Sequence, residues 1–269
     1  MKISVIVSTY NSPAWLEKVL TGYACQTDGD FEIVVADDGS APATRELIER
    51  FAATPPFRVH HVWHEDDGFR KCAILNKAIA AAEGDYLIFT DGDCIPRVDF
   101  VAMHRAFATP GRFLSGGYCK LPMATSKAIS NDDIRSGRAF SVLWLMRHGY
   151  APTLKWLKIL SRPWRIDGAL NALSPARTTF NGNDSSCWRE DALRVGGFDE
   201  RMGYGGEDRE FGYRLTNAGI APKVIRYSAL CLHLDHARGY KDPEIRRRNE
   251  AIIEQTRKKG AVRTEFGMR

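Results

Sequence analysis

The first 90 residues alternate between short apolar runs and longer amphipathic segments, and this alternation constrains the fold most. Four runs are continuous and rich in β-branched residues, as strands buried on both faces of a sheet are. They span Ile3–Val7, Phe31–Ala36, Phe57–Trp63 and Tyr86–Thr90. Helical patterns follow the first three, over Pro13–Gln26, Ser40–Phe51 and Lys71–Ala82. This order predicts an α/β fold with a mostly parallel, Rossmann-like central sheet flanked by helices.

Polar segments follow the predicted strands at the point where each strand ends. They are Ser8–Asn11, Asp37–Ser40, Glu65–Lys71 and Asp91–Asp93. In such sheets ligands bind beyond the carboxyl ends of the strands, so these segments locate a candidate site. No G-x-G-x-x-G or Walker A sequence follows the first strand, which argues against a dinucleotide fold and a P-loop.

Two groups of side chains have the chemistry of metal ligands. Asp91 and Asp93, separated by one glycine, suit Mg²⁺ or Mn²⁺ bridged to phosphate oxygens, although Asp-Gly is also a common turn pair. His233 and His236 lie far along the chain and either add imidazole ligands, which favour Mn²⁺, or form a surface pair without a ligand. The histidines within 60–64 are interpreted as packing residues at a strand end.

A glycine-rich loop, Gly203–Gly206, delivers two adjacent carboxylates, Glu207 and Asp208, to the start of a predicted helix. One interpretation is a general base that acts on a substrate hydroxyl. The other is a helix cap or a first-turn charge favoured by the helix dipole. The glycines favour the first interpretation, because a cap does not need them.

Seven short motifs in a fixed order make the chain resemble a family 2 glycosyltransferase of the GT-A fold. They are Ser8-Thr-Tyr-Asn11, Asp37-Asp-Gly-Ser40, Gly68-Phe-Arg-Lys71 with Asn76, Asp91-Gly-Asp93, Gly196-Gly-Phe-Asp-Glu200, Gly205-Gly-Glu-Asp208 and His233-x-x-His236. The C-terminal half is similar to β-1,4-galactosyltransferases and to the transferase domains of bacterial chondroitin polymerase. The resemblance covers roughly residues 1–236.

The resemblance implies a pocket for a UDP-sugar donor at the strand ends. Its residues would be Ser8, Thr9, Asp38, Arg70, Lys71, Asp91 and Gly92. Asp38 would accept a hydrogen bond from the uracil N3–H, and Asp91 would contact the ribose or the water shell of the metal. Arg70 and Lys71 would lie near the diphosphate, where positive charge is favourable.

The resemblance also implies a metal-dependent inverting transfer. Asp93 would bind Mn²⁺ or Mg²⁺ directly, and His236 with His233 would complete the metal site from the other half of the chain. The metal would neutralise the charge that develops on the leaving UDP. A single displacement at the anomeric carbon would then invert the configuration of that carbon.

On the acceptor side, the resemblance implies that Asp208 is the base and that Glu207 holds the acceptor sugar. Tyr204 and Gly206 would contact the acceptor from the glycine-rich loop. The galactosyltransferases carry tryptophan where this chain has Tyr204. The difference keeps an aromatic surface for stacking but leaves the preferred sugar open.

The formal charge of +5 is unevenly distributed. Residues 1–133 and 167–236 together carry 28 acidic and 21 basic side chains, whereas residues 134–166 carry seven basic ones and no acid. Because the body is acidic and no aromatic residues interleave the basic residues within 243–259, a nucleic-acid partner is disfavoured. Glu250 and Glu254 alternate with the basic residues of the tail and predict a solvated helix over 243–259.

The basic middle segment is also rich in tryptophan. Within residues 142–166, Leu154, Leu157 and Leu160 recur at helical spacing beside lysines. This pattern predicts either an interfacial helix on an anionic membrane surface or a helical lid over the acceptor site, and both interpretations stay open. A lipid-linked, negatively charged acceptor such as lipopolysaccharide core is compatible with both.

We expect one compact domain with three parts. Residues 1–125 would bind the nucleotide sugar, 126–236 would bind the acceptor and catalyse transfer with a helical insert at about 134–176, and 237–269 would form a basic helical tail. Six scattered cysteines, no apolar run of about 20 residues and no signal-peptide core predict a cytoplasmic protein, with peripheral binding to the inner membrane left open.

The expected function is transfer of a sugar from UDP to a saccharide or glycolipid acceptor in lipopolysaccharide or capsule synthesis. Two alternatives are a sugar-phosphate nucleotidyltransferase and a non-catalytic glycan- or nucleotide-binding module. The first is disfavoured because the chain lacks an arginine-containing glycine-rich loop after the first strand. The second is disfavoured because such a module needs no catalytic base beside metal ligands.

Overall fold

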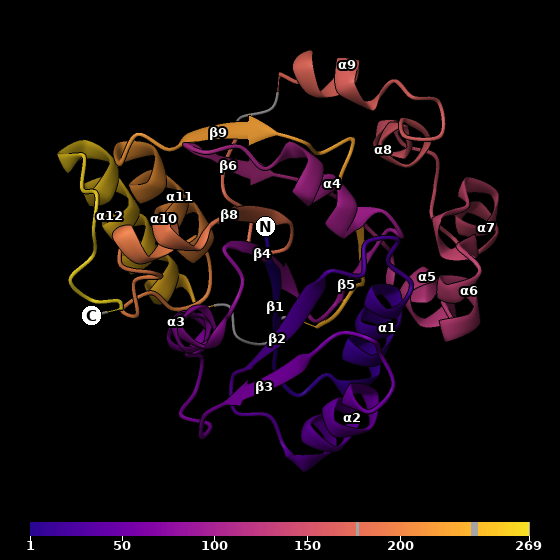
Figure 1. The fold of residues 1–269 in the computed structure, drawn as a ribbon, viewed down its shortest axis with the longest axis horizontal. Helices are drawn as coiled ribbons and strands as arrows, with labels where there is room; N and C mark the ends of the chain where they lie inside the picture. Colours follow the sequence, from indigo (N-terminus) through magenta and orange to yellow (C-terminus); the bar gives the residue numbers. More distant parts are fainter. Residues whose placement is uncertain (176–177, 238–241, 269) are drawn as a thin grey trace.

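The computed structural model describes residues 1–175, 178–237 and 242–268. A central sheet of seven strands has the order β3-β2-β1-β4-β8-β6-β9 (Figure 1). These strands are β1 (Ile3–Thr9), β2 (Phe31–Asp37), β3 (Val59–Trp63), β4 (Tyr86–Asp91), β6 (Arg112–Ser115), β8 (Ser185–Trp188) and β9 (Ala221–Val224). β1 to β4 pair in parallel, whereas β8 runs antiparallel to both β4 and β6. The predicted mostly parallel α/β sheet is confirmed, and β8 is an antiparallel member that the sequence pattern did not reveal.

Helices cover both faces of this sheet because the side chains of β1 alternate between two apolar clusters. Ile3 and Val5 belong to a cluster shared with α1 (Pro13–Ala24), α2 (Pro42–Ala52) and α4 (Phe100–Phe107). Ile6 belongs to the opposite cluster. That cluster includes side chains of α3 (Lys71–Ala81), α10 (Arg189–Arg194) and α11 (Glu207–Asn217).

A second sheet of three strands joins the segment at 94–120 to the distant segment at 230–233. It consists of β5 (Cys94–Pro96), β10 (Leu230–His233) and β7 (Gly117–Lys120), in the order β5-β10-β7. β10 runs antiparallel to β5, with His233 opposite Cys94. This pairing carries the histidines of residues 233–236 to the end of β4, although they lie about 140 residues away in the sequence.

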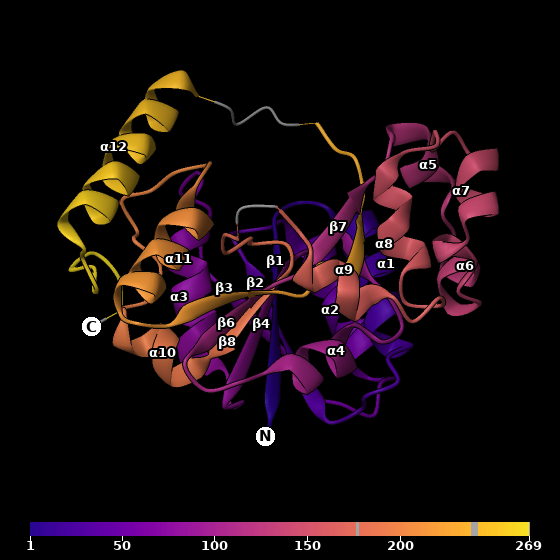
Figure 2. The same ribbon diagram turned by 90° about the horizontal axis from the view of Figure 1, so that it is seen from above.

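Five short helices and two 3₁₀ turns occupy the segment between 123 and 172. The helices are α5 (Met123–Ala128), α6 (Asn131–Arg135), α7 (Val142–Arg147), α8 (Leu157–Leu160) and α9 (Asp167–Ala172), and the turns span Arg138–Phe140 and Leu154–Trp156. The helical structure expected through Leu154, Leu157 and Leu160 is present, as a 3₁₀ turn that continues directly into α8. Figure 2 shows these helices on one side of the molecule and α12 (Pro243–Lys259) on the other.

The tail forms the helix expected from its sequence. α12 carries the ion pairs Arg257–Glu254 and Arg247–Glu244 on its exposed side. Its other side buries Asn249 and Ile253, and the helix packs along α11. Within the described parts of the chain, no helix combines the length and the apolar character needed to cross a membrane.

Candidate active site

A cavity of about 680 Å³ opens at the carboxyl ends of β1, β2 and β4. Ten of the residues singled out from the sequence line it: Ser8, Thr9, Asp38, Lys71, Asp91, Gly92, Asp93, Tyr204, His233 and His236. The backbone segments at this edge of the sheet lie close together. A Cβ on Gly92 would lie 3.0 Å from the carbonyl oxygen of Ser8, so a larger residue would push the two strand ends apart. The strand-end site expected from the sequence is therefore present as one cavity.

Asp38 lies in the wall of this cavity and is held by two donors. Its Oδ1 is 2.7 Å from His64 Nε2, and its Oδ2 accepts a hydrogen bond from the backbone N–H of Arg70 at 3.0 Å. Burial raises the pKa of Asp38 above its ordinary value, although His64 and the Arg70 amide oppose that shift. The carboxylate is thus fixed in orientation, as a group that recognises one face of a base must be.

The side chain of Arg70 points away from the cavity, toward Asp67 at 3.4 Å. Lys71, the next residue, points into it. Lys71 Nζ is 2.7 Å from Asp91 Oδ1 and 3.9 Å from Glu207 Oε1. Burial would lower the pKa of Lys71, but the carboxylates of Asp91 and Glu207 outweigh it and raise the pKa above its ordinary value. Lys71 is therefore a permanent cation at the meeting point of the two halves.

Asp93 and the two distant histidines come together beside Lys71. His236 Nε2 lies 3.1 Å from Asp93 Oδ2, and His233 Nδ1 lies 3.9 Å from the same oxygen. The rings of His233 and His236 are nearly parallel, with 6.0 Å between their centroids. Burial would raise the pKa of Asp93, but the hydrogen bond from His236 and the nearby His233 outweigh it and lower the pKa.

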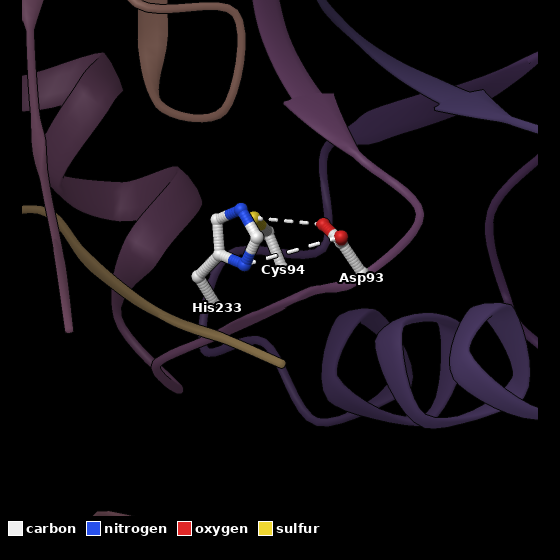
Figure 3. Close-up of side chains that lie close together, drawn as sticks. All are labelled: Asp93, Cys94 and His233. Carbon is white, nitrogen blue, oxygen red and sulfur yellow. Dashed lines mark hydrogen bonds and ion pairs between the residues drawn. The ribbon is translucent and has the colours of Figure 1, made fainter. Parts of the chain in front are cut away.

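The donor set of this cluster fits a divalent transition metal. His236 Nδ1 is 2.8 Å from the carbonyl oxygen of Ala237, which can only accept, so loss of the Nε2 proton that faces Asp93 would leave a lone pair there for a metal. A carboxylate and imidazole nitrogens are ligands that Mn²⁺ accepts. Figure 3 shows Asp93 and His233 converging, with Cys94 alongside. Burial raises the pKa of the Cys94 thiol far above its ordinary value, so Cys94 stays protonated and is a poor ligand.

The acceptor side is built by the glycine-rich loop and the first turn of α11. Gly205 and Gly206 both have positive φ, at 108° and 92°, which turns the chain sharply into the helix. Glu207 Oε2 accepts a hydrogen bond from the backbone N–H of Gly205 at 3.0 Å. Burial raises the pKa of Glu207, and Asp208 adds to that effect while Lys71 opposes it.

Asp208 is close enough to Lys71 to raise the pKa of that lysine, and it lies beside the cavity rather than in its lining. Its Oδ2 accepts a hydrogen bond from the backbone N–H of Gly182 at 2.9 Å, and its Oδ1 accepts one from Arg209 N–H at 2.7 Å. Each oxygen retains a further lone pair, so the carboxylate is oriented and still able to accept a proton.

Sequence patterns alone missed several residues of the site. Phe69, which had been given no role, contacts the predicted acceptor residue Tyr204 edge to face at 5.8 Å and lines the cavity with it. Trp15, also in the wall, donates its Nε1–H to the carbonyl of Asp235 between the two histidines. His64, interpreted from the sequence as a packing residue, instead holds Asp38. Only its position near the end of the third strand could have indicated this role.

Comparisons with known proteins agree with this geometry. Residues 4–113 match the model "Glycosyl transferase family 2", and residues 170–237 match "N-terminal domain of galactosyltransferase". Validoxylamine A glucosyltransferase of Streptomyces hygroscopicus is 31% identical over 84% of this chain and 54% of its own length. Chondroitin synthase of Escherichia coli is 26% identical over 81% of this chain and 32% of its own. The chain thus spans about half or less of these relatives.

Solved structures show the same fold. The Pyrobaculum calidifontis mannosyltransferase in complex with GDP-Man and Mn²⁺ superposes with a TM-score of 0.59 at 23% identity, over 88% of this chain and 58% of that one. The Staphylococcus aureus TarS fragment in complex with UDP-GlcNAc gives a TM-score of 0.60 at 18% identity, over 94% and 66%. The fold is therefore GT-A, as the motifs predict. On this evidence the chain belongs to the family 2 glycosyltransferases, and its second half is related to the galactosyltransferases.

Proposed function

We propose that this chain is a metal-dependent inverting glycosyltransferase that uses a UDP-sugar donor. The observation that carries the proposal is the arrangement around Lys71. Lys71 pairs with Asp91, two residues before the candidate metal ligand Asp93, and it is also near the candidate base, Asp208. Asp93 itself lies beside His233 and His236. We assign the leaving group to the metal side and the acceptor hydroxyl to the Asp208 side, as an in-line displacement requires.

The nucleotide part of the donor fits the wall formed by Ser8, Thr9 and Asp38. Asp38 is the group we assign to the uracil N3–H, because His64 and the Arg70 amide fix its carboxylate. Solved relatives carry UDP-GlcNAc in one case and GDP-Man in another, so the fold accommodates either base. The assignment of UDP therefore rests on Asp38 rather than on the fold.

Asp93, His233 and His236 would hold Mn²⁺ or Mg²⁺, which would supply positive charge to the diphosphate of the leaving group. Lys71 adds a second, permanent positive charge next to Asp91. The Ser8 hydroxyl donates to Asp91 Oδ1 at 2.7 Å and fixes that carboxylate against the donor. These side chains would bind and orient the leaving group.

Asp208 is the residue we assign to accept the proton of the acceptor hydroxyl. Glu207, buried and tied to the Gly205 amide, would hold the acceptor sugar, and Tyr204 would stack against it. Gly206 permits the turn that brings these side chains together. Attack from the Asp208 side, opposite the leaving group, inverts the anomeric carbon.

The helices between 142 and 166 suggest where the acceptor meets the enzyme. Leu145 and Ile159 are buried, whereas Leu143, Leu154 and Trp164 are exposed beside the basic side chains. We assign these exposed residues to an anionic membrane surface, since apolar and cationic groups together bind anionic lipid. The acceptor would be a saccharide or glycolipid of lipopolysaccharide or capsule, reached from the cytoplasmic side of the inner membrane.

Two experiments test this proposal. A panel of UDP-sugars and GDP-sugars is incubated with the protein and Mn²⁺ or EDTA, and release of the nucleotide is measured. We expect Mn²⁺-dependent hydrolysis of a UDP-sugar, and hydrolysis that is independent of metal or restricted to GDP-sugars would contradict the assignment. Co-sedimentation with vesicles of phosphatidylglycerol tests the membrane surface, because Trp164→Ala should weaken binding and leave UDP-sugar hydrolysis unchanged.

A further inference from the structure

A second cavity, of about 420 Å³, lies between the glycine-rich loop and the first turns of α12. Its walls are formed by Tyr204, Gly205, Gly206, Arg209, Asp242, Pro243, Arg246 and Glu250. Tyr204 lines both this cavity and the catalytic one, so the two are neighbours across a single aromatic ring. An acceptor saccharide that stacks on Tyr204 therefore has room to continue toward α12.

Hydrogen bonds and close packing hold the glycine-rich loop against α12. Asn249 is fully buried and donates to the carbonyl oxygens of Gly203 and Gly205, at 2.9 and 3.0 Å. A Cβ on Gly203 would lie 2.7 Å from Ile245 of α12, which shows how closely the loop approaches the helix. α12 lies beyond residues 170–237, where the galactosyltransferase match ends, so the wall that α12 contributes lies outside the matched segment.

The charges in the cavity leave one cation without a partner. Arg209 pairs with Glu250 at 2.6 Å, and Asp242 Oδ1 accepts a hydrogen bond from the backbone N–H of Glu244. Arg246 makes no side-chain hydrogen bond or ion pair with any residue in the described ranges. Its neighbour Arg247 does not line the cavity and pairs with Glu244 at 3.7 Å. Arg246 alone therefore offers an unused guanidinium to a ligand in the cavity.

From this arrangement we infer that the cavity is a second acceptor subsite, in which Arg246 binds a phosphate or carboxylate on the acceptor saccharide. The inference rests on the proposed function, because it assigns Tyr204 to the acceptor path. It narrows the acceptor to a saccharide that carries a negative charge beyond the sugar that receives the new bond. Guanidinium groups suit both anions, since their paired N–H groups match two oxygens.

Glucose 6-phosphate and glucose serve as probes for this subsite. Their binding is measured by NMR in the presence of saturating UDP and Mn²⁺, which occupy the phosphate-binding part of the donor site. The variant is Arg246→Gln, and the matched control is Arg247→Gln, one residue along the same helix but outside the cavity. Both positions are exposed, so neither substitution threatens folding.

We expect the wild type and Arg247→Gln to bind glucose 6-phosphate more tightly than glucose, and Arg246→Gln to lose about fivefold in affinity for it. Wild-type affinity in Arg246→Gln, or an equal loss in Arg247→Gln, would overturn the inference. The UDP titration that precedes the measurement tests the donor assignment separately. Failure of UDP to bind would contradict the proposed function, whereas the comparison of the two arginine variants would still decide the subsite.

Discussion

At the scale of single residues, Lys71 joins the donor and acceptor halves, because its ammonium group contacts Asp91 and approaches Glu207. Replacing it by methionine would leave two carboxylates facing one another without a cation. We expect Lys71→Met to weaken UDP binding by at least about tenfold, measured by calorimetry with Mn²⁺ present. Lys223→Met, on β9, is the control, and equal affinity in the two variants would show that Lys71 does not act on the donor.

Asp208 is the residue that we propose as the base of the transfer step. Asp208→Asn keeps the size of the side chain and an oxygen that can accept one of the two hydrogen bonds from the Gly182 and Arg209 amides, but it removes the basic carboxylate. The rate constant for transfer should therefore fall by about 10²- to 10⁴-fold, while UDP binding stays at the wild-type value. Transfer at near the wild-type rate would assign the base to another residue.

At the scale of elements, α12 supports the loop that carries the acceptor residues. Asn249→Ala would leave the carbonyl groups of Gly203 and Gly205 without their donor and loosen Tyr204. We expect the KM for the acceptor to rise, with donor hydrolysis unchanged, because the donor site lies on other elements. An equal loss of both activities would indicate general unfolding rather than a positioning role, which the melting temperature would confirm.

The C-terminal segment is held to the rest of the second half by Asp199. Its carboxylate binds Arg201 at 2.7 Å and the Thr264 hydroxyl at 2.8 Å. Burial would raise the pKa of Asp199, but the hydrogen bonds from Arg201 and Thr264 lower it below its ordinary value of 3.8. The ionised form therefore stabilises the fold above pH 3.8, and this contribution is lost as the pH falls through the lowered pKa.

Asp199→Asn should consequently lower the free energy of unfolding by about 1–3 kcal/mol at pH 7. The difference from the wild type should shrink below pH 3.8, where the wild-type carboxylate also loses its charge. Urea unfolding at a series of pH values measures it. A difference that is independent of pH would mean that the charge of Asp199 contributes nothing.

At the scale of the whole molecule, the sequence predicted what apolar periodicity and strand-end position encode. Continuous β-branched runs gave β1 to β4, and the polar segments after them form one cavity. The antiparallel strand β8 was not predicted, because its sequence, Ser185–Trp188, has no such run. That strand pairs through its backbone with β4 and β6, and the Ser186 hydroxyl also contacts Tyr86 and His104, at 2.8 and 2.7 Å.

Sequence patterns also could not predict the environment of single residues or the contacts between distant segments. The helical spacing of Leu154 and Leu157 predicted helical structure, which is present, but it could not show that Leu154 would be 87% exposed. The hydrogen bonds of Asn249 to the glycine-rich loop depend on how α12 packs, which no local pattern records. The motifs identified the groups of the candidate site, whereas the fold shows how they are held.

The central claim is that one molecule combines a UDP pocket with a metal site built from both halves of the chain. Calorimetric titration of UDP with and without Mn²⁺, on the wild type and on Asp93→Ala, tests it most directly. The account predicts that Mn²⁺ strengthens UDP binding in the wild type and has no such effect in Asp93→Ala. Equal UDP affinity with and without Mn²⁺ in the wild type, or an undiminished Mn²⁺ effect in Asp93→Ala, would contradict it.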